Sequence, residues 1–274
     1  MTSPDQEEID RFRKKVWAFY REKGRHDLPW RSTTNPYRIL VSEVMLQQTQ
    51  VSRCLVKYPE FIGAYPDFSS LAGAPLADLL RVWQGMGYNR RAIALKKTAE
   101  MIMTCYNGDL PGEDAELRSL PGIGKATAAS IAAFAFNLPV VFIETNIRRV
   151  FIHCFFPGEL CVPDREILPL VSATLDHEKP REWYYALMDL GAALGKKIRN
   201  PNRRSAHYHV QTRFEGSRRQ VRGKILALLT ASVTLTFGDI ARMTGEDPEI
   251  VHSLILALQK EGFLVTEGHS VRIR

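Results

Sequence analysis

The feature that most constrains this chain is a short glycine motif, Leu120-Pro121-Gly122-Ile123-Gly124-Lys125, which lies between two segments with helical periodicity. Two glycines spaced two residues apart allow a tight hairpin whose backbone can approach another molecule closely. The N–H groups at the start of the following helix then point outward, and together with Lys125 they can bind a phosphate. A bare Gly-x-Gly also occurs in ordinary turns, but the longer string with a second helix after it predicts a helix-hairpin-helix that binds the DNA backbone.

The rest of the sequence up to residue 215 is also helical in its pattern. Residues 7–20 carry an apolar stripe at helical spacing, formed by Ile9, Phe12, Val16, Trp17 and Tyr20. Prolines divide the following sequence at intervals typical of short helices. Residues 138–147 are β-like in composition but too isolated to build a sheet. We therefore predict a mainly α fold.

Residues 218–274 have a different pattern. Helical segments are expected at residues 219–229, 236–243 and 247–262, followed by two short apolar runs around a Glu267-Gly268-His269 turn. Three helices that end in a β-hairpin are typical of a winged helix-turn-helix, in which the third helix often enters the DNA major groove. The acidic residues Glu246, Asp247 and Glu249 weaken this expectation, and a small packing or dimerisation domain is the alternative.

The charge is concentrated in one segment. The chain has a net charge of +7, while residues 196–224 alone contain ten basic residues and one acidic residue. A solvated basic linker is one interpretation. Tyr208 and Phe214 lie among the charges, and the segment joins two parts that both have DNA-binding patterns, so we favour contact with phosphates. Arg203 and Arg204 are the DNA-contacting candidates in it.

The four cysteines Cys54, Cys105, Cys154 and Cys161 do not have the spacing of a zinc or iron–sulfur site, so no metal is predicted. We expect them to be reduced, buried and inert. No apolar run is long enough for a membrane span, and the polar first ten residues do not resemble a secretory signal. The protein is therefore expected in the cytoplasm, associated with the nucleoid.

Two acidic residues lie in unusually apolar segments. Glu43 is flanked by residues 39–46, and Glu144 by residues 140–147. Burial raises the pKa of a carboxyl group, as a general acid requires, and paired carboxylates are the groups that cleave glycosidic bonds. Taken singly, each could instead cap a helix or form a buried ion pair. Together with a predicted DNA clamp they favour catalysis.

Several longer motifs carry a family resemblance. They are Leu28-Pro29-Trp30-Arg31, residues 42–51 (SEVMLQQTQV), residues 83–88 (WQGMGY), residues 120–127 and Met188-Asp189-Leu190-Gly191-Ala192. These motifs resemble the helix-hairpin-helix (HhH-GPD) DNA glycosylase superfamily, and within it the adenine DNA glycosylases of the MutY type. The resemblance covers roughly residues 8–195 and implies a fold of two helical lobes. We expect a glycosylase domain at residues 1–195, a basic segment at 196–217 and a winged-helix-like domain at 218–274.

The resemblance also implies roles by position. Glu43 would protonate the leaving base, and Glu144 would take the place of the second catalytic acid. Gln48 would fill the gap that the flipped base leaves, and Tyr88 would support the DNA beside it. The positions implied for the base pocket are Trp30, Arg31, Leu46, Asn146 and Tyr185. The backbone of Gly122, Gly124 and Ala126, beside Lys125, would hold phosphates, with a possible monovalent cation at the hairpin.

The chain also departs from the family pattern. Glu144 stands where relatives have an aspartate, and Tyr185 where they often have a polar residue. Ala126 occupies the position of the lysine nucleophile of bifunctional enzymes, so no β-lyase activity is expected. Residues 195–216 lack the cysteines of the relatives' iron–sulfur cluster, so no cluster is expected. A winged-helix-like domain replaces the domain that senses 8-oxoguanine.

Together these features predict a monofunctional DNA glycosylase of base excision repair, a monomer that acts on double-stranded DNA with a mispaired or damaged base. Adenine opposite guanine or 8-oxoguanine is the first expectation. The alternatives are thymine or uracil opposite guanine, or a modified base. A non-catalytic DNA-binding protein, either a lesion sensor or a regulator, is a further alternative. The glutamate at position 144 in place of aspartate favours it, and the intact motif around Glu43 opposes it.

Overall fold

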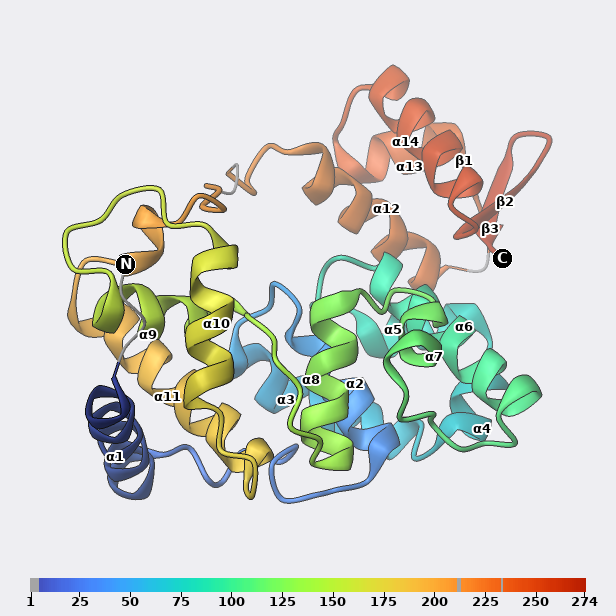
Figure 1. Ribbon diagram of the computed structural model, residues 1–274. Helices are drawn as coiled ribbons and strands as arrows, with labels where there is room; N and C mark the ends of the chain where they lie inside the picture. Colours follow the sequence, from blue (N-terminus) through green and yellow to red (C-terminus); the bar gives the residue numbers. More distant parts are fainter. Residues whose placement is uncertain (1–4, 211–212, 233) are drawn as a thin grey trace. The chain divides into compact units, whose positions relative to one another are not determined.

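The computed structural model describes residues 5–210, 213–232 and 234–274, which form two compact units (Figure 1). Unit 1 consists of Met1–Glu43, Pro111–Ser119 and Ile123–Val210, and unit 2 of Val44–Leu110, Leu120–Gly122 and Gln211–Arg274. Residues 211–212 of the predicted basic segment lie outside the described residues. The predicted mainly α fold is confirmed.

Unit 1 is built from helices that the chain supplies from three separate stretches. They are α1 (Gln6–Lys23), α2 (Pro36–Leu46) as far as Glu43, α7 (Asp114–Ser119), α8 (Lys125–Phe136), α9 (Thr145–Phe155), α10 (Asp164–Thr174), α11 (Pro180–Lys197) and the 3-10 turn η1 (Pro201–Arg204). Helix α8 is apolar on all sides, with Ala, Ile and Phe side chains around its axis, and it is therefore buried along most of its length. The β-like stretch at residues 138–144 forms no regular element and leads into α9.

Helices α9 and α11 of unit 1 approach each other closely. At Gly191 of α11 an added Cβ would lie 2.3 Å from the carbonyl oxygen of Asn146, so only glycine is compatible with this contact. Arg149 ties the same two helices together, because its Nη1 donates to the Gly191 carbonyl at 2.7 Å and to Asn146 Oδ1 at 2.9 Å. The start of α9 is thereby fixed against α11.

The segment that follows α11 is held against α9 by two of its own side chains. Asn202 is buried, and its Nδ2 donates to the Thr145 carbonyl at 2.9 Å. Arg204 donates to the carbonyls of Phe156 and Ile152 at the end of α9. The carbonyl groups at a helix end lack intrahelical donors, so Arg204 acts there as a C-terminal cap.

Unit 2 contains the middle helices of the chain and its C-terminal part. The middle helices are α3 (Val51–Ala64), α4 (Phe68–Ala72), α5 (Leu76–Trp83) and α6 (Arg90–Cys105), together with the end of α2. The buried face of α5 is formed by Leu79, Leu80 and Trp83. The ring of Phe61, on α3, packs against that of Trp83 with the ring centroids 5.7 Å apart. Thr98 of α6 donates its hydroxyl to the Pro121 carbonyl at 3.0 Å, which anchors the hairpin residues of this unit.

The C-terminal part of unit 2 has the predicted winged-helix arrangement. Its elements are α12 (Arg218–Ala231), β1 (Leu235–Thr236), α13 (Phe237–Thr244), α14 (Pro248–Lys260), β2 (Leu264–Glu267) and β3 (Ser270–Ile273). The three strands form an antiparallel sheet in the order β1-β3-β2. Thr236 and Asp239 form a capping box that starts α13, and the left-handed Gly245 ends it. The predicted boundaries of three domains stay a prediction, since the two units divide the chain in another way.

Among the described residues, no helix is long and apolar enough to cross a membrane. The expectation that all four thiols are buried is wrong for two of them. Cys54 is buried and Cys154 partly buried, whereas Cys105 and Cys161 are exposed. Cys105 is the last residue of α6 and Cys161 lies in the turn before α10. Both positions are at the surface, because ends of helices and turns bury fewer side chains than the middle of a packed helix.

Candidate active site

Glu43 of helix α2 has the properties of an acid that is protonated near neutral pH. Burial raises the pKa of its carboxyl group to about 7, and the negative charge of Glu144 adds to this effect. A hydrogen bond with the Ser130 hydroxyl and the positive charge of Arg31 act in the opposite direction. Glu43 can therefore donate a proton at a pH at which an exposed glutamate is fully ionised.

Ser130 was not predicted as a site residue. It lies on buried helix α8, and its hydroxyl also donates to the Thr127 carbonyl at 3.0 Å. A hydroxyl has one hydrogen, so Ser130 can give it to Thr127 or to the Glu43 carboxylate. Donation to the carboxylate favours the ionised form and thus limits the rise of the Glu43 pKa. A serine in an alanine-rich helix shows no sign of this role in the sequence.

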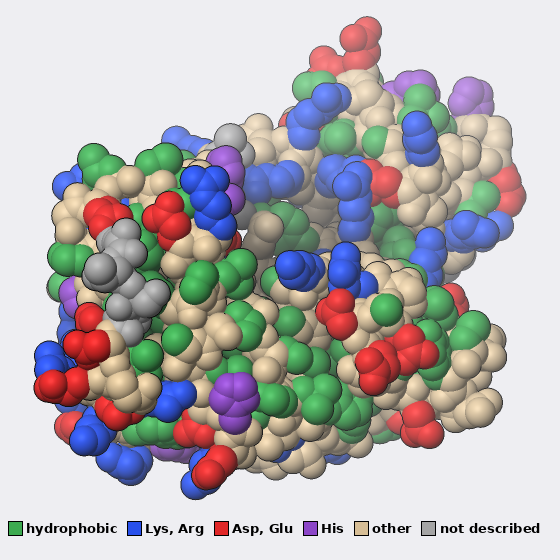
Figure 2. Space-filling model, in the orientation of Figure 1, with side chains coloured by type: hydrophobic (Ala, Val, Ile, Leu, Met, Phe, Trp, Pro, Cys, Tyr) green, Lys and Arg blue, Asp and Glu red, His purple; other side chains and the backbone are tan. Residues whose placement is uncertain are grey.

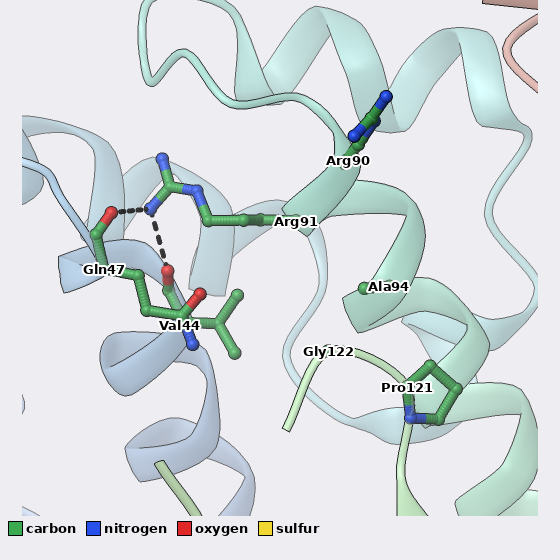
Figure 3. Close-up of a pocket in the computed structure, with 7 residues that line it drawn as sticks. All are labelled: Val44, Gln47, Arg90, Arg91, Ala94, Pro121 and Gly122. Carbon is green, nitrogen blue, oxygen red and sulfur yellow. Dashed lines mark hydrogen bonds between the residues drawn. The ribbon is translucent and has the colours of Figure 1, made fainter. Parts of the chain in front are cut away.

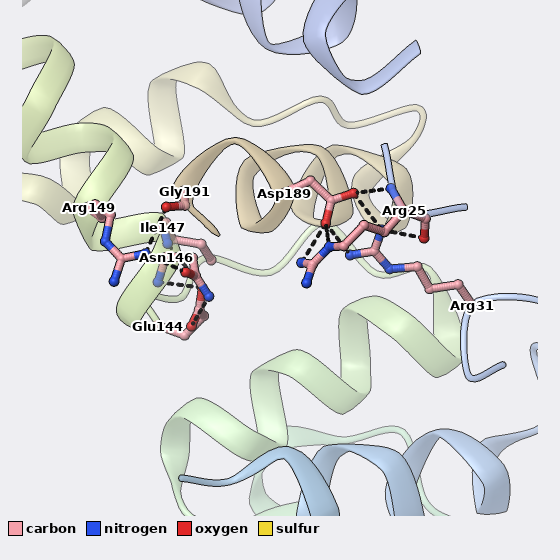
Figure 4. A network of polar contacts seen from close by, with 8 residues as sticks. All are labelled: Arg25, Arg31, Glu144, Asn146, Ile147, Arg149, Asp189 and Gly191. Atoms are coloured by element: carbon pink, nitrogen blue, oxygen red, sulfur yellow. Dashed lines mark hydrogen bonds and ion pairs between the residues drawn. The ribbon is translucent and has the colours of Figure 1, made fainter. Parts of the chain in front are cut away.

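Glu144 is the N-cap of helix α9, one of the two structural roles foreseen for it. Its Oε1 accepts hydrogen bonds from the backbone N–H groups of Asn146 at 2.7 Å and of Ile147 at 3.0 Å (Figure 4). Burial raises the pKa of Glu144, while these N–H groups, the Asn146 amide and Arg149 favour its ionised form. Capping occupies Oε1, and Oε2 has a 3.4 Å contact with Asn146 Nδ2, so Oε2 is the carboxylate oxygen that takes no part in capping the backbone of α9.

Asp189 is a second residue that sequence reasoning missed, although it lies within a quoted motif. It is buried on α11 and binds two arginines, Arg31 and Arg25 (Figure 4). Arg31 donates from both terminal nitrogens, at 2.7 and 2.9 Å, and the Arg25 backbone N–H donates at 2.8 Å. The pKa of Asp189 is lowered, because these donors outweigh the effect of burial. Asp189 therefore fixes the guanidinium of Arg31.

Four of the five residues assigned to the base pocket, Trp30, Arg31, Asn146 and Tyr185, belong to unit 1 with both acids. Trp30 and Tyr185 are buried, and the Tyr185 ring stacks on Phe134 with ring centroids 4.6 Å apart. The Arg31 guanidinium lies 4.4 Å from the centroid of the Tyr185 ring. Leu46, the fifth residue, belongs to unit 2.

Gln48 and Tyr88, predicted to probe DNA, both lie in unit 2 and both have a left-handed backbone, with φ of 53° and 47°. Tyr88 is 40% exposed. A left-handed conformation is uncommon for residues with a side chain and persists where the surrounding structure enforces it. The two loops therefore hold Gln48 and Tyr88 in unusual backbone conformations.

Arg91 of helix α6 supplies that constraint (Figure 3). Its Nη1 donates to the carbonyls of Val44, Met45 and Gln47, the last at 2.6 Å. Its Nη2 donates to the hydroxyl of Thr49 and to the carbonyls of Met86 and Gly87. One guanidinium thus binds both the loop that carries Gln48 and the loop that carries Tyr88. Burial lowers the pKa of Arg91 to about 10, so it stays charged at neutral pH.

The hairpin itself has the predicted form, with α7 before it and α8 after it. Gly122 has φ of 79°, and an added Cβ would lie 2.8 Å from Ala94 Cβ, so glycine is required there. Gly124 is the N-cap of α8 and contributes no side-chain cap, while Lys125 and Ala126 are exposed. The start of α8 is thus open to an anion, as a phosphate contact requires.

The structure separates the two arginines proposed for the basic segment. Arg203 is exposed, as a phosphate contact needs. The guanidinium of Arg204 instead donates to carbonyl groups at the end of α9 inside unit 1, and its assignment to DNA contact stays a prediction. Charge pattern alone cannot distinguish the two, because neighbouring residues of a 3-10 turn point in different directions.

Within the described residues there is no group of three or more His, Cys, Asp or Glu side chains that could hold a metal ion. The four cysteines come from α3, α6, α9 and the turn before α10. Residues 195–216, where the family resemblance implied a cluster loop, contain no cysteine, and Asn202 and Arg204 hold part of that segment. The side chains present do not fit an iron–sulfur cluster.

Comparison with known proteins identifies the family of the chain. The family model described as "HhH-GPD superfamily base excision DNA repair protein" matches residues 41–166, which include both acids and the hairpin. An adenine DNA glycosylase of Mycobacterium tuberculosis is 35% identical over 252 residues, which cover 83% of this chain and 82% of that protein. The chain belongs to the HhH-GPD superfamily of base excision DNA repair proteins. The resemblance stated from the motifs is confirmed.

Two further relatives define how far the likeness extends. An adenine DNA glycosylase of Buchnera aphidicola is 36% identical over 187 residues, and the match spans 67% of this chain but only 52% of that protein. The solved structure of a thermostable thymine-DNA glycosylase superposes with a TM-score of 0.60 at 25% identity, over 68% of this chain and 87% of that one. The HhH-GPD fold is therefore confirmed.

Proposed function

We propose that this HhH-GPD protein is a monofunctional adenine DNA glycosylase, which hydrolyses the bond between adenine and deoxyribose where adenine is opposite guanine or 8-oxoguanine. The observation that carries the proposal is Glu43, whose pKa of about 7 is raised by burial and by the neighbouring charge of Glu144. The names of its curated relatives support adenine as the target. A cytoplasmic, nucleoid-associated location is part of the proposal.

The chemistry follows from the two acids. The target base is flipped out of the duplex, Gln48 fills its place, and Tyr88 supports the neighbouring DNA. Glu43 gives its proton to the base as the C1′–N bond breaks, so the base leaves neutral. The Glu144 carboxylate stabilises the cationic sugar, and water adds to C1′ and gives one proton to the Glu43 carboxylate, which leaves an abasic site and restores the acid. Ala126 has no amine, so the protein forms no Schiff base and does not cleave the strand.

A thymine glycosylase acting opposite guanine is the second candidate. It is favoured by the likeness to the thymine-DNA glycosylase and by Tyr185, an aromatic residue that stacks on Phe134 and contacts Arg31 in the predicted pocket. Thymine has no purine ring nitrogen for Glu43 to protonate, so this reaction would depend more on stabilisation of the sugar by Glu144.

The test is single-turnover incubation with labelled duplexes that contain A opposite 8-oxoguanine, A opposite G, T opposite G or U opposite G. Strand breaks that appear only after alkali, and only with the adenine duplexes, are expected. Glu43→Gln should abolish excision and keep DNA binding. Processing of T opposite G would favour the second candidate, and breaks without alkali would overturn the assignment based on Ala126. Tight binding without excision of any base would indicate a lesion-binding protein.

A further inference from the structure

We propose that the winged-helix domain binds the phosphate backbone of duplex DNA through its first helix, α12, and not through its third helix, α14. The partner is the DNA that flanks the target base. The proposal concerns unit 2 only, in which α12, α14, Tyr88 and the hairpin residues Leu120–Gly122 all lie. It rests on DNA as the ligand and is independent of which base is removed.

Contacts within unit 2 place the start of α12 beside a predicted DNA-probing residue. Arg219 Nη1 donates to the hydroxyl of Tyr88 at 3.3 Å. At the other end of α12, Arg81 of α5 donates to the Thr230 carbonyl at 3.1 Å. Helix α12 is therefore held against α5 and against the loop between α5 and α6 that carries Tyr88. A DNA strand that reaches Tyr88 also reaches Arg219.

Glu261, which follows α14, fixes this arrangement. Its carboxylate forms paired hydrogen bonds with Arg90 of α6, both at 2.7 Å, and with Arg222 of α12, at 2.9 and 2.6 Å. One negative charge is shared by two guanidinium groups, which leaves a local excess of positive charge. A cavity of about 250 Å³ lies here, lined by Arg90, Lys97, Pro121, Glu261 and Phe263 among others, so the winged-helix domain adjoins the hairpin.

The charge of α12 suits DNA phosphates. Residues 218–231 include Arg218, Arg219, Arg222 and Lys224 and contain no acidic residue. Figure 2 shows Lys and Arg side chains gathered where the winged-helix domain meets the helices beside it. Arg218 is exposed and donates a hydrogen bond to the hydroxyl of Ser253 at 2.8 Å, a neutral group that does not neutralise its charge. Such a surface attracts phosphates over a distance of about 10 Å.

The third helix has the opposite character. Asp247 caps α14 and accepts hydrogen bonds from the N–H groups of Glu249 and Ile250, so a carboxylate already occupies the end that would face a phosphate. Glu249 adds a second negative charge in the first turn. The exposed face of α14 also carries the apolar residues Ile250 and Leu256, at 40% and 48% exposure. Groove insertion of α14 would bring these carboxylates close to DNA phosphates.

The experiment measures the salt dependence of binding to an uncleaved mismatch duplex, with the full-length Glu43→Gln protein as the parent. Each phosphate contact contributes about 0.9 to the slope of log K against log salt. Substituting Arg218→Gln and Arg219→Gln together should make that negative slope shallower by about two. Gly223 is an exposed position one turn after Arg219, where an added side chain meets no neighbour. Gly223→Lys should therefore make the slope steeper by about one.

Matched controls lie elsewhere on the same domain. Gly238→Lys adds the same charge at an exposed helical glycine of α13, and Arg242→Gln removes an exposed charge from the same helix. Neither should change the slope. Arg219→Lys keeps the charge but loses the fork geometry, and it should retain the slope of the parent. Lysine favours the helical conformation more than glycine does, so Gly223→Lys is not expected to destabilise the fold.

The proposal is overturned if the α12 substitutions leave the slope unchanged, or if the α13 controls change it by the same amount. It is also overturned if Glu249→Lys, which reverses charge at the start of α14, strengthens binding more than Gly223→Lys does. These outcomes do not depend on excision. A protein that removes no base can still confirm the α12 surface, and an active glycosylase can still contradict it.

Discussion

Asp189 and Arg31 form a buried, two-pronged ion pair in which Arg31 Nη1 and Nη2 donate to the two carboxylate oxygens at 2.7 and 2.9 Å. The side chains are only 1% and 5% exposed. Arg31 also lies against Tyr185 and lowers the pKa of Glu43 by its charge. The position of a charge near the candidate catalytic acid thus depends on an aspartate that lies far away in the sequence.

Replacing Asp189 by asparagine should destabilise unit 1, because Arg31 would keep its buried charge and lose its counterion. Removing one partner of a buried ion pair costs about 3–5 kcal/mol. Denaturant unfolding measures the loss. The control is Asp164→Asn, which breaks a similar two-pronged pair with Arg148 whose side chains are more exposed, at 29% and 17%. An equal loss in both variants would contradict a special role for Asp189.

Replacing Ser130 by alanine should shift the pH dependence of excision. Glu43 acts while protonated, so activity is present below its pKa of about 7 and is lost as the pH rises through that value. The Ser130 hydroxyl favours the ionised form, and its removal raises the Glu43 pKa further, so the decline should move to higher pH. Single-turnover rates across the pH range measure it, with Ser172→Ala on exposed α10 surface as control. A shift to lower pH would refute the assignment.

Replacing Arg91 by lysine should impair the handling of DNA and leave the acid unchanged. One ammonium group cannot reproduce six hydrogen bonds to two loops, so Gln48 and Tyr88 would lose their fixed conformations. We expect the rate of base flipping, measured by 2-aminopurine fluorescence, to fall at least about tenfold. The pH at which excision declines should stay the same. Arg53→Lys, at an exposed position of α3, is the control. Normal flipping in Arg91→Lys would show that the arginine only stabilises the fold.

Replacing Glu261 by glutamine should remove a pH-dependent part of the stability. The hydrogen bonds with Arg90 and Arg222 lower the Glu261 pKa from 4.5 to about 2. Because the pKa of Glu261 is lowered on folding, its carboxylate contributes fully to the stability of the fold above about pH 4.5. This contribution is lost as the pH falls toward about 2. We expect the substitution to cost about 2 kcal/mol at pH 7, discounted because Arg90 is exposed, and much less near pH 3. Unfolding at both pH values tests it, with the exposed pair variant Glu267→Gln as control.

Much of the fold was predictable from local pattern. The hairpin at Gly122 and Gly124, the helices around it and the winged-helix order of the last residues all follow from turn residues and hydrophobic periodicity. The two candidate acids could also be found, because a glutamate within an apolar segment is rare. What these patterns could not show is how each acid is used, and Glu144 proves to cap α9 with one oxygen.

The sequence by itself therefore determined the helical elements, the hairpin and the winged-helix tail, and it singled out the two candidate acids, because all of these depend on near neighbours in the chain. Tertiary structure alone decided that Asp189 holds Arg31, that Ser130 reaches Glu43, that Arg91 joins two loops, and that Arg204 turns inward as a cap. The physical reason is that hydrogen bonds and burial act between side chains that folding brings together, whatever their separation along the chain.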